Sequence, residues 1–459
     1  MVATDVTSSP TDYLGDEAEA KQDNVSSLSQ PLSISCYPHP LANPKIVERA
    51  DGEQSPLTRY YAGFSEQFVT SVVRRLGLDQ YSMLLDPWNG SGTTTYVCQR
   101  LGISSVGLDL NPAMSLAAKA RCVVCDNNDL KSDYDKINEL AASAVAVPVA
   151  TDGDDMLQTW LSSEATSAVR KLIGIISKLT GVQTPFSNPN DASDRFSLYF
   201  SILTATVRNR LKELATSNPT WIRMVVSEEE RIELTFDELF VEFMDNFRTH
   251  MARKRELFAL AESLAKPMIL RGNSQHIPLD SSSIDAVITS PPYCTRIDYA
   301  VATAVELAVL GATRRDFKTL RTSLMGSTSV STPPDITKLG PICRAILEDV
   351  RLHQSYASQR YYYKTYCNYF YSLGNSISEL SRVLKRGGKV ALVLQNSFHK
   401  DIELDIISVA KEMGLAHSLY PFSSVVFANS KTKAHLHPVV REQGRKKILS
   451  ETMVLFEKL

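Results

Sequence analysis

Four consecutive residues could hold a flat ligand by its amino group. Ser290, Pro291, Pro292 and Tyr293 place a hydroxyl and an aromatic ring beside prolines that have no N–H to donate. The preceding run, 283–289, predicts a buried parallel strand that ends at the serine. Carbonyl oxygens near this strand end are free to accept hydrogen bonds, at the edge where open α/β sheets bind ligands. A plain loop after a strand is the alternative that these residues alone leave open.

A glycine-rich turn earlier in the chain has the form of a binding loop. An apolar run predicts a strand that ends at Asp86, and Pro87, Gly90 and Gly92 then lead into a helix that begins near Thr93. Glycines allow the backbone to approach a ligand closely, and the amides of a helix start face acceptors. No Gly-Lys-Ser/Thr follows, so this is not a Walker loop, and the spacing differs from the dinucleotide pattern Gly-x-Gly-x-x-Gly.

A second predicted strand, which begins at Ser105 and ends at Asp109, brings an acidic residue to the same edge. Asp109 follows the glycine-rich turn by about twenty residues, which is the separation at which an acid binds ribose hydroxyls. The order of strand, turn, helix, strand and acid therefore predicts a ribose contact. A turn that caps the next helix is the structural alternative for 109–112.

The composition is that of an ordinary globular protein in a reducing compartment. The 459 residues carry a formal net charge of −2, so any nucleic-acid site must be a local basic patch. The seven cysteines are scattered, and the single CxxC of Cys122 and Cys125 predicts buried thiols and no metal site. We find neither a signal pattern nor an apolar run long enough to span a bilayer, which predicts a cytoplasmic protein without a membrane partner.

Shifts in the hydrophobic pattern divide the chain into four parts. Residues 1–45 are rich in Ser, Asp, Thr and Pro and predict a disordered or loosely attached arm. Residues 46–126 hold the first half of a sheet domain, 127–265 predict a helical insertion, and 266–459 hold the second half. Within the second half, 312–365 interleave aromatic and basic residues, which suits nucleic-acid contact or a packed helix.

The C-terminal part predicts regular elements and a basic loop. A helix over 402–413 that stops at Gly414 precedes two strands, 425–427 and 452–456, which are expected to pair antiparallel. Basic residues occur in the loop that joins these two strands and also in the helices of the insertion, and both groups could face phosphates. For the insertion, a solvated helix face is the alternative. These residues are Arg208, Arg210, Lys212, Arg248, Arg253, Lys254 and Arg255 in the insertion, and Lys431, Lys433, Arg441, Arg445, Lys446 and Lys447 in the loop.

Together the motifs resemble those of S-adenosylmethionine-dependent DNA methyltransferases that modify exocyclic amino groups. The runs 86–94 and 107–112 look like the cofactor loop and the ribose-binding acid of this family, and 290–293 like its catalytic tetrapeptide. The stretches 61–68 and 218–221 are also similar to bacterial members. The resemblance implies a Rossmann-like class I methyltransferase fold, which is an α/β architecture with a mostly parallel seven-stranded sheet, an antiparallel C-terminal strand and, here, a helical insertion.

The resemblance also implies a role for each site residue. Ser290 and a proline carbonyl would accept hydrogen bonds from the amino group of a base flipped out of double-stranded DNA, and Tyr293 would stack on that base. The methyl donor would be S-adenosyl-L-methionine. Its binding residues would be Asp86, Pro87, Gly90 and Gly92 at the methionine end, Thr93 at the carboxylate, Asp109 at the ribose, Phe64 alongside, and Asn273 near the adenine, where many relatives have Asp.

The first residue of the tetrapeptide bears on which base is modified. Serine at this position is, in the family, more typical of cytosine-N4 than of adenine-N6 modification, so N4 of cytosine is the expected target and N6 of adenine the alternative. No Pro-Cys dipeptide occurs, which disfavours methylation of cytosine C5. An RNA base as substrate, a non-catalytic recognition subunit, and a cognate restriction endonuclease as partner stay open. The expected place of action is the nucleoid of a bacterial or archaeal cytoplasm.

Overall fold

A single sheet forms the centre of the molecule, and the computed structural model describes residues 4–6, 40–45, 63–124, 127–143, 154–183, 186–216, 221–258, 265–294, 298–327, 330, 333–427 and 450–459. The sheet has eight strands in the order β1-β9-β10-β6-β5-β2-β3-β4, and β7 and β8 pair separately. The strands are β1 (Thr4–Val6), β2 (Met83–Asp86), β3 (Ser104–Asp109), β4 (Met268–Arg271), β5 (Ile284–Thr289), β6 (Leu384–Gln395), β7 (Ser397–His399), β8 (Ile402–Leu404), β9 (Leu419–Phe427) and β10 (Glu451–Lys458).

Most neighbouring strands run parallel, as predicted. β4, β3, β2, β5 and β6 pair in parallel, whereas β10 lies antiparallel between β6 and β9. The predicted class I methyltransferase fold is therefore confirmed, and so is the C-terminal antiparallel pair, in which Thr452 lies opposite Val426. β1 adds an eighth strand beside β9, which the composition of the N-terminal arm did not predict.

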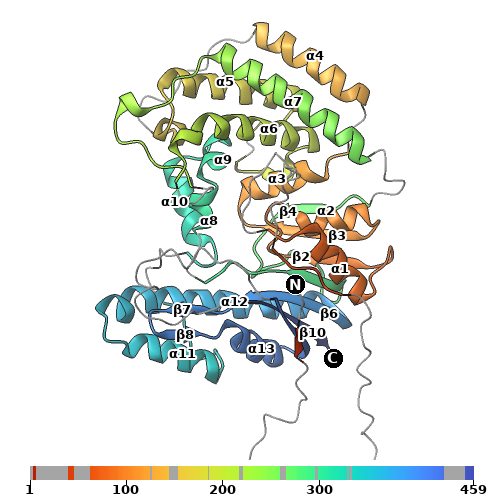
Figure 1. The fold of residues 1–459 in the computed structure, drawn as a ribbon, viewed down its shortest axis with the longest axis vertical. Helices are drawn as coiled ribbons and strands as arrows, with labels where there is room; N and C mark the ends of the chain where they lie inside the picture. Colours follow the sequence, from red (N-terminus) through yellow and green to blue (C-terminus); the bar gives the residue numbers. More distant parts are fainter. Residues whose placement is uncertain are drawn as a thin grey trace, which may run out of the picture.

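Helices cover both faces of the sheet (Figure 1). Side chains alternate between the faces along each strand, so Leu84 of β2 packs with α1 and α2, while Leu85 packs with α12 and α13. The helices of the sheet domain are α1 (Glu66–Leu76), α2 (Thr93–Arg100), α3 (Pro112–Cys122), α11 (Pro341–Leu352), α12 (Tyr363–Val383) and α13 (Ile406–Ala416), with a π-helical turn, η6 (Ser358–Tyr362), before α12.

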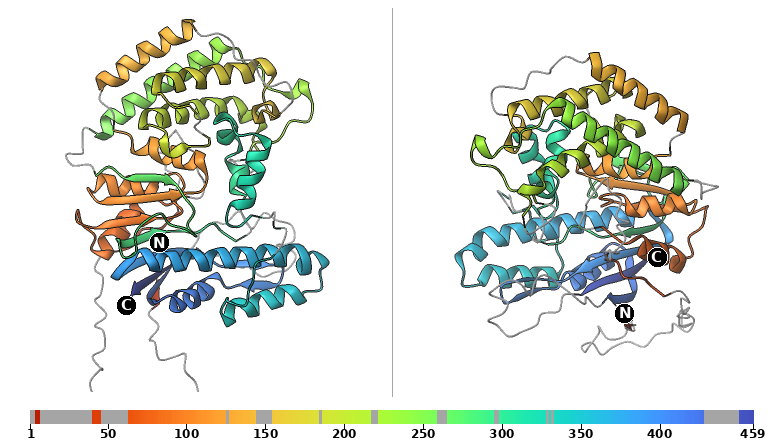
Figure 2. Two further views of the ribbon diagram at one scale, coloured as in Figure 1. Left: turned by 180° about the vertical axis from the view of Figure 1, so that it is seen from behind. Right: turned by 45° about the horizontal axis from the view of Figure 1, so that its top comes forward.

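A helical bundle stands at one end of the sheet domain, and α11 to α13 lie at the other (Figures 1 and 2). The bundle contains the predicted insertion, and Leu307 and Leu320, which follow the tetrapeptide, pack in the same hydrophobic core. Its helices are α4 (Asn127–Ser143), α5 (Ser163–Thr180), α6 (Asp194–Arg210), α7 (Phe236–Phe258), α8 (Tyr299–Ala302), α9 (Ala304–Val309) and α10 (Arg314–Ser323), with short 3₁₀ turns η2 (Met156–Thr159), η3 (Pro189–Asp191), η4 (Leu211–Leu214) and η5 (Glu228–Glu230).

The helix predicted over 402–413 is wrong at both ends. Its first residues form β8 instead, and Asp405 caps α13 by accepting a hydrogen bond of 3.2 Å from the backbone N–H of Ser408. Gly414, predicted to stop the helix, lies inside it. A Cβ at Gly414 would lie 2.7 Å from the ring of Phe456, so this glycine allows α13 to pack closely on β10.

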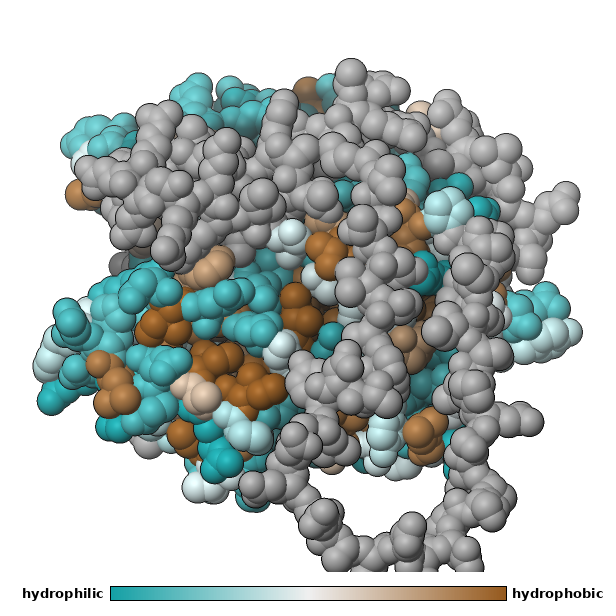
Figure 3. Space-filling model, turned by 60° about the horizontal axis from the view of Figure 1, so that its bottom comes forward, coloured by the Kyte–Doolittle hydropathy of each residue, from teal (hydrophilic) through white to brown (hydrophobic). Residues whose placement is uncertain are grey.

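The face of the molecule that turns forward in Figure 3 is mixed in character. Hydrophobic residues lie there in separate patches among hydrophilic ones, where the described part of the chain is visible (Figure 3). In the described part of the chain, the clusters of buried apolar side chains lie between the sheet and its helices and inside the bundle.

Candidate active site

One pocket lies at the carboxyl ends of three neighbouring strands. β2, β3 and β5 end at Asp86, Asp109 and Thr289, and the pocket beyond them holds about 1030 Å³ of empty space, including its open mouth. Its lining includes every predicted site residue except Gly92: Phe64, Asp86, Pro87, Gly90, Thr93, Asp109, Asn273, Ser290, Pro291, Pro292 and Tyr293.

Asp86 is a buried carboxylate with donors around it. It is 3% exposed, and its Oδ1 accepts hydrogen bonds from the hydroxyl of Thr289 at 2.6 Å and from the backbone N–H of Trp88 at 3.1 Å. Burial raises the pKa of Asp86 to about 6, although these hydrogen bonds act in the opposite direction. The side chain is therefore ionised at neutral pH and can accept further hydrogen bonds from a ligand.

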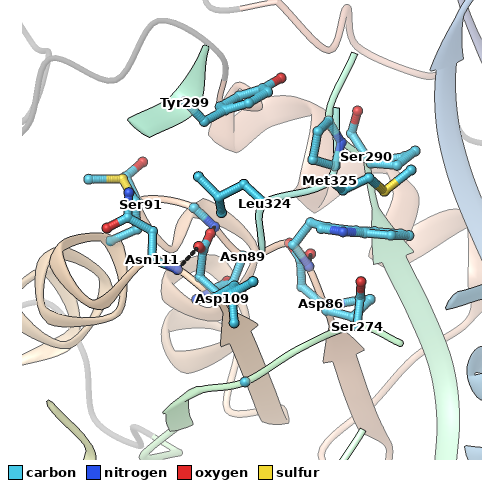
Figure 4. Close-up of a pocket in the computed structure, with 18 of the residues that line it drawn as sticks. Asp86, Asn89, Ser91, Asp109, Asn111, Ser274, Ser290, Tyr299, Leu324 and Met325 are labelled. Atoms are coloured by element: carbon cyan, nitrogen blue, oxygen red, sulfur yellow. Dashed lines mark hydrogen bonds between the residues drawn. The ribbon is translucent and has the colours of Figure 1, made fainter. Parts of the chain in front are cut away.

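Asp109 has a matching arrangement at the next strand end. Its Oδ2 accepts the N–H of Gly90 at 3.0 Å, and its Oδ1 accepts the N–H of Asn111 at 2.8 Å, drawn as a dashed line in Figure 4. Burial and the charge of Asp86 raise the pKa of Asp109 to about 6. Each oxygen keeps a lone pair for a hydroxyl donor, so the carboxylate can bind the diol of a ribose.

The two glycines of the turn, Gly90 and Gly92, have different surroundings. Both have positive φ, 49° at Gly90 and 81° at Gly92, so an L side chain would be strained at either position. Gly90 lines the pocket and donates to Asp109. Gly92 lies behind the pocket, where an added Cβ would be only 2.7 Å from the Cβ of Ala118. It therefore packs between α2 and α3, and its contribution to the cofactor site stays a prediction.

The tetrapeptide follows β5 directly into the pocket. The hydroxyl of Ser290 makes no hydrogen bond with the part of the chain that the structure describes, and in Figure 4 it lies above Asp86, next to Met325. Pro291 is buried and Pro292 partly buried. The backbone N–H of Tyr293 donates to the hydroxyl of Tyr299 at 3.1 Å. The strand end therefore presents acceptors and a ring to the same space.

The remaining predicted residues line the pocket with partners of their own. The side-chain oxygen of Asn273 accepts the N–H of Gln275 at 3.0 Å, in a tight turn after β4. The hydroxyl of Thr93 accepts a hydrogen bond of 3.0 Å from Arg121, and the ring of Phe64 lies 5.0 Å from that of Phe68. Thr93 is only 5% exposed, so its reach into the pocket is small.

Several lining residues were missed by the sequence reasoning. Tyr299 begins α8, and burial raises the pKa of its phenol to about 12. Asn111 caps α3 by accepting from Ala113 and donates to the hydroxyl of Thr303 at 2.7 Å, so the capping turn that the sequence left open does exist beside the ligand-facing Asp109. Leu324 and Met325 come from the end of α10, and no local pattern in the sequence indicates their place.

Two of the basic residues of the insertion are held in ion pairs within the bundle, whereas Lys212 is exposed and Arg248 forms an ion pair with Asp245 at the surface. Arg208 forms an ion pair with Glu306 and donates to the carbonyl of Ala302 at 2.7 Å. Arg210 pairs with Glu242, and its guanidinium is therefore also occupied. The side chains of Arg253, Lys254 and Arg255, the basic loop 431–447 and the stretch 218–220 lie outside the described residues.

Within the described ranges, no group of three or more His, Cys, Asp or Glu side chains could hold a metal ion. Cys122 is a buried free thiol, whereas Cys125 lies outside the described residues. No helix in the described part of the chain is long and apolar enough to cross a membrane.

Comparison with curated proteins finds methyltransferases. The chain is 26% identical over 299 residues to the Type II methyltransferase M.BsoBI of Geobacillus stearothermophilus, a match that covers 59% of this chain and 55% of that protein. It is 22% identical over 456 residues to the Type II methyltransferase M.AvaI of a Nostoc strain, covering 89% of this chain and 90% of the relative. The chain thus spans about half the length of the first relative. The predicted relationship to methyltransferases is confirmed.

Other comparisons add little. No family model matches the chain. Among solved structures, a putative sarcosine dimethylglycine methyltransferase from Galdieria sulphuraria aligns with a TM-score of 0.30 and 11% identity, covering 86% of this chain and 84% of that chain.

Proposed function

We propose that this relative of Type II methyltransferases transfers a methyl group from S-adenosylmethionine to the exocyclic amino group of a base in double-stranded DNA. One observation carries the proposal. The carboxylates of buried Asp86 and partly buried Asp109 and the acceptors that begin at Ser290 line a single pocket, although roughly two hundred residues of sequence separate the carboxylates from the tetrapeptide. Strand ends of one sheet bring together groups that suit a nucleoside-like cofactor and an amine.

The residues present fit S-adenosylmethionine, which supplies an electrophilic methyl group when bound. Asp109 would accept the ribose hydroxyls, because its ionised oxygens keep free lone pairs beside the N–H of Gly90. Asp86 and Pro87 would border the methionine end of the cofactor, and Thr93 would contact the carboxylate of the methionine. Phe64 and Asn273 would lie on the adenine side. Gly90 and Gly92 would shape the same methionine end, Gly92 from behind the pocket lining.

The tetrapeptide would bind and activate the amine. The lone pair of an aromatic amino group is delocalised into the ring, and hydrogen bonds from its protons to Ser290 and a proline carbonyl would localise it on nitrogen. Such fixed acceptors favour the transition state, in which positive charge builds on nitrogen. Tyr293 would stack on the base. A base can reach this pocket only by leaving the duplex, at a cost of a few kcal/mol that protein contacts must offset.

The first residue of the tetrapeptide favours cytosine N4 as the target. Ser290 stands where an aspartate is, in the family, more typical of adenine-N6 enzymes. Both bases carry an amino group of the same geometry, so N6 of adenine is the runner-up.

We propose that the exposed face of α10 contacts the DNA. Phe317, Leu320 and Leu324 pack in the bundle core, and the opposite side of the helix exposes Arg315 and Lys318. The residues after α10 line the pocket. A rise of 1.5 Å per residue puts Lys318 roughly 8 Å from the end of α10 at Ser323. Cations at this distance from a base pocket suit the phosphates beside a flipped nucleotide.

The roles proposed for the parts of the chain are those that the sequence predicts. The sheet domain, from 46–126 and 266–459, would hold cofactor and base, and the insertion at 127–265 and the segment 312–365 would contribute to recognition of the duplex. A cognate endonuclease as partner, and the nucleoid as the place of action, belong to the same proposal.

Radiolabelled methyl transfer from S-adenosylmethionine tests the proposal directly. Purified protein is offered mixed-sequence duplex DNA and total tRNA side by side, with Ser290→Ala and Tyr293→Ala as variants that keep cofactor binding. We expect label on DNA alone and its loss in both variants. Label on tRNA alone would establish an RNA enzyme, and cofactor binding without transfer to either acid would establish a non-catalytic subunit.

A further inference from the structure

A hydrogen bond fixes the tip of the tyrosine ring in the pocket. The phenol of Tyr293 donates to Oε1 of Glu451 at 2.7 Å, across a sequence separation of 158 residues. Glu451 is the first residue of β10 and lies between Phe427 of β9 and Gln395 of β6. Its backbone position is therefore set by two strand ladders.

The carboxylate of Glu451 is buried where it accepts this hydrogen bond. Glu451 is 4% exposed, and burial raises its pKa, whereas the hydrogen bond from Tyr293 and the charge of Lys45 lower it. A buried carboxylate is costly unless it is paired. Lys45 pairs with Phe64 across a β-bridge, and Phe64 lines the pocket. The segment that holds Lys45 therefore lies close to both the pocket wall and the carboxylate of Glu451.

The other end of the tyrosine is also held. Its backbone N–H donates to the hydroxyl of Tyr299, and Pro292 before it restricts the backbone. Tyr299 begins α8, which is capped by Asp298, and Asp298 is in turn paired with Arg321 at 2.6 Å. Backbone and phenol oxygen are thus both anchored, which fixes the two torsions between them.

We propose that Glu451 is a positioning residue that holds the ring of Tyr293 in the orientation in which it stacks on the target base. This inference rests on the proposed function. A ring that must receive a flipped base gains from being fixed before the base arrives, because the freedom is then not lost during binding. A charge-assisted hydrogen bond to a strand residue provides such an anchor.

A pair of variants of equal size separates the hydrogen bond from packing. Glu451→Gln keeps an acceptor for the phenol, while Glu451→Leu fills the space without one. In single-turnover methyl transfer at saturating cofactor and DNA, we expect Glu451→Gln to stay near the wild-type rate. Glu451→Leu and Tyr293→Phe should each lose on the order of tenfold to a hundredfold, with the Kd for S-adenosylmethionine unchanged. The double variant Tyr293→Phe with Glu451→Leu should be no slower than either single variant, because both remove one bond.

A second readout needs no substrate. Protein labelled with 3-fluorotyrosine gives a ¹⁹F signal for position 293, which is assigned by its absence in Tyr293→Phe. We expect Glu451→Leu to shift or broaden this signal and Glu451→Gln to preserve it, with equal melting temperatures as the check on folding. An unchanged signal in Glu451→Leu, or equal transfer rates for the leucine and glutamine variants, would overturn the positioning role. A wild-type protein that methylates no DNA would instead overturn the proposed function.

Discussion

The hydroxyl of Thr289 donates a hydrogen bond of 2.6 Å to the carboxylate of Asp86 and so joins the end of β5 to the end of β2. The ladder between these strands pairs Leu84 with Ala286 and Leu85 with Val287, and the contact lies beyond it. One side chain therefore fixes the start of the cofactor loop relative to the start of the tetrapeptide. Since a methyl donor and its acceptor must be aligned, this contact bears on catalysis as well as on stability.

Replacing Thr289 by valine keeps the shape and removes the donor. Asp86 is then a buried carboxylate with one partner fewer, so we expect a loss of roughly 1–3 kcal/mol in the free energy of unfolding, measured by urea denaturation at pH 7.5. Thr180→Val is the matched control, because within the described residues its hydroxyl bonds only to the backbone carbonyl of Ile176 in α5. Equal losses of unfolding free energy in the two variants would show that the hydrogen bond to Asp86 contributes no more to stability than the one to a backbone carbonyl.

Asp109 makes stability and cofactor binding depend on pH in opposite directions. Its pKa is raised from 3.8 to about 6, so the folded protein favours the protonated form, and this contribution to stability is lost as the pH rises from about 4 to about 6. Asp109→Asn keeps a neutral side chain at every pH. We expect the variant to gain about 2 kcal/mol relative to the wild type between pH 4.5 and 7.5, in paired urea titrations.

The same variant should bind the cofactor poorly. Only the ionised carboxylate accepts both ribose hydroxyls, so calorimetry should find that wild-type affinity falls below about pH 6 while that of Asp109→Asn is weak throughout. Wild-type binding that is independent of pH from 5 to 8 would contradict the ribose contact.

The sequence predicts the parts of this site that are local. A strand that ends at Asp86, a strand that ends at Asp109 and the tetrapeptide after β5 each follow from hydrophobic pattern and turn residues, and parallel pairing then brings them to one edge. Glu451 and Met325 could not be found in this way. Each reaches the site through tertiary packing, from the start of β10 and the end of α10, and its neighbours in the sequence carry no motif.

Gly92 illustrates the difference between a motif and its physical reason. The motif predicts a ligand contact, and its φ of 81° and the 2.7 Å approach of an added Cβ to Ala118 indicate a packing role as well. Gly92→Ala should cost roughly 2–4 kcal/mol from backbone strain and overpacking together. Gly77→Ala is the control, because that glycine has a φ of 68° with nothing within 4 Å of an added Cβ. Similar unfolding midpoints for the two variants would mean that the contact with Ala118 relaxes freely.

The basic face of α10 should be visible in the salt dependence of DNA binding. Each phosphate contact contributes about 0.9 to the slope of log K against log salt, so Arg315→Ala with Lys318→Ala should flatten the slope by about 2. Cofactor affinity should not change. Lys131→Ala with Lys136→Ala removes two exposed lysines from α4, at the far end of the bundle (Figure 1), and should leave the slope as it is. A slope equally insensitive to both pairs would exclude α10 from the DNA path.

The most direct measurement of the central claim is sequencing of modified bases in DNA from cells that express the protein. We predict N4-methylcytosine at one short recurring sequence in cells with the wild type, and none in cells with Ser290→Ala, a change that removes one acceptor of the amino group. N6-methyladenine in its place would keep the amino-group chemistry and correct the base. DNA without any modified base in the presence of folded, cofactor-binding protein would contradict the account.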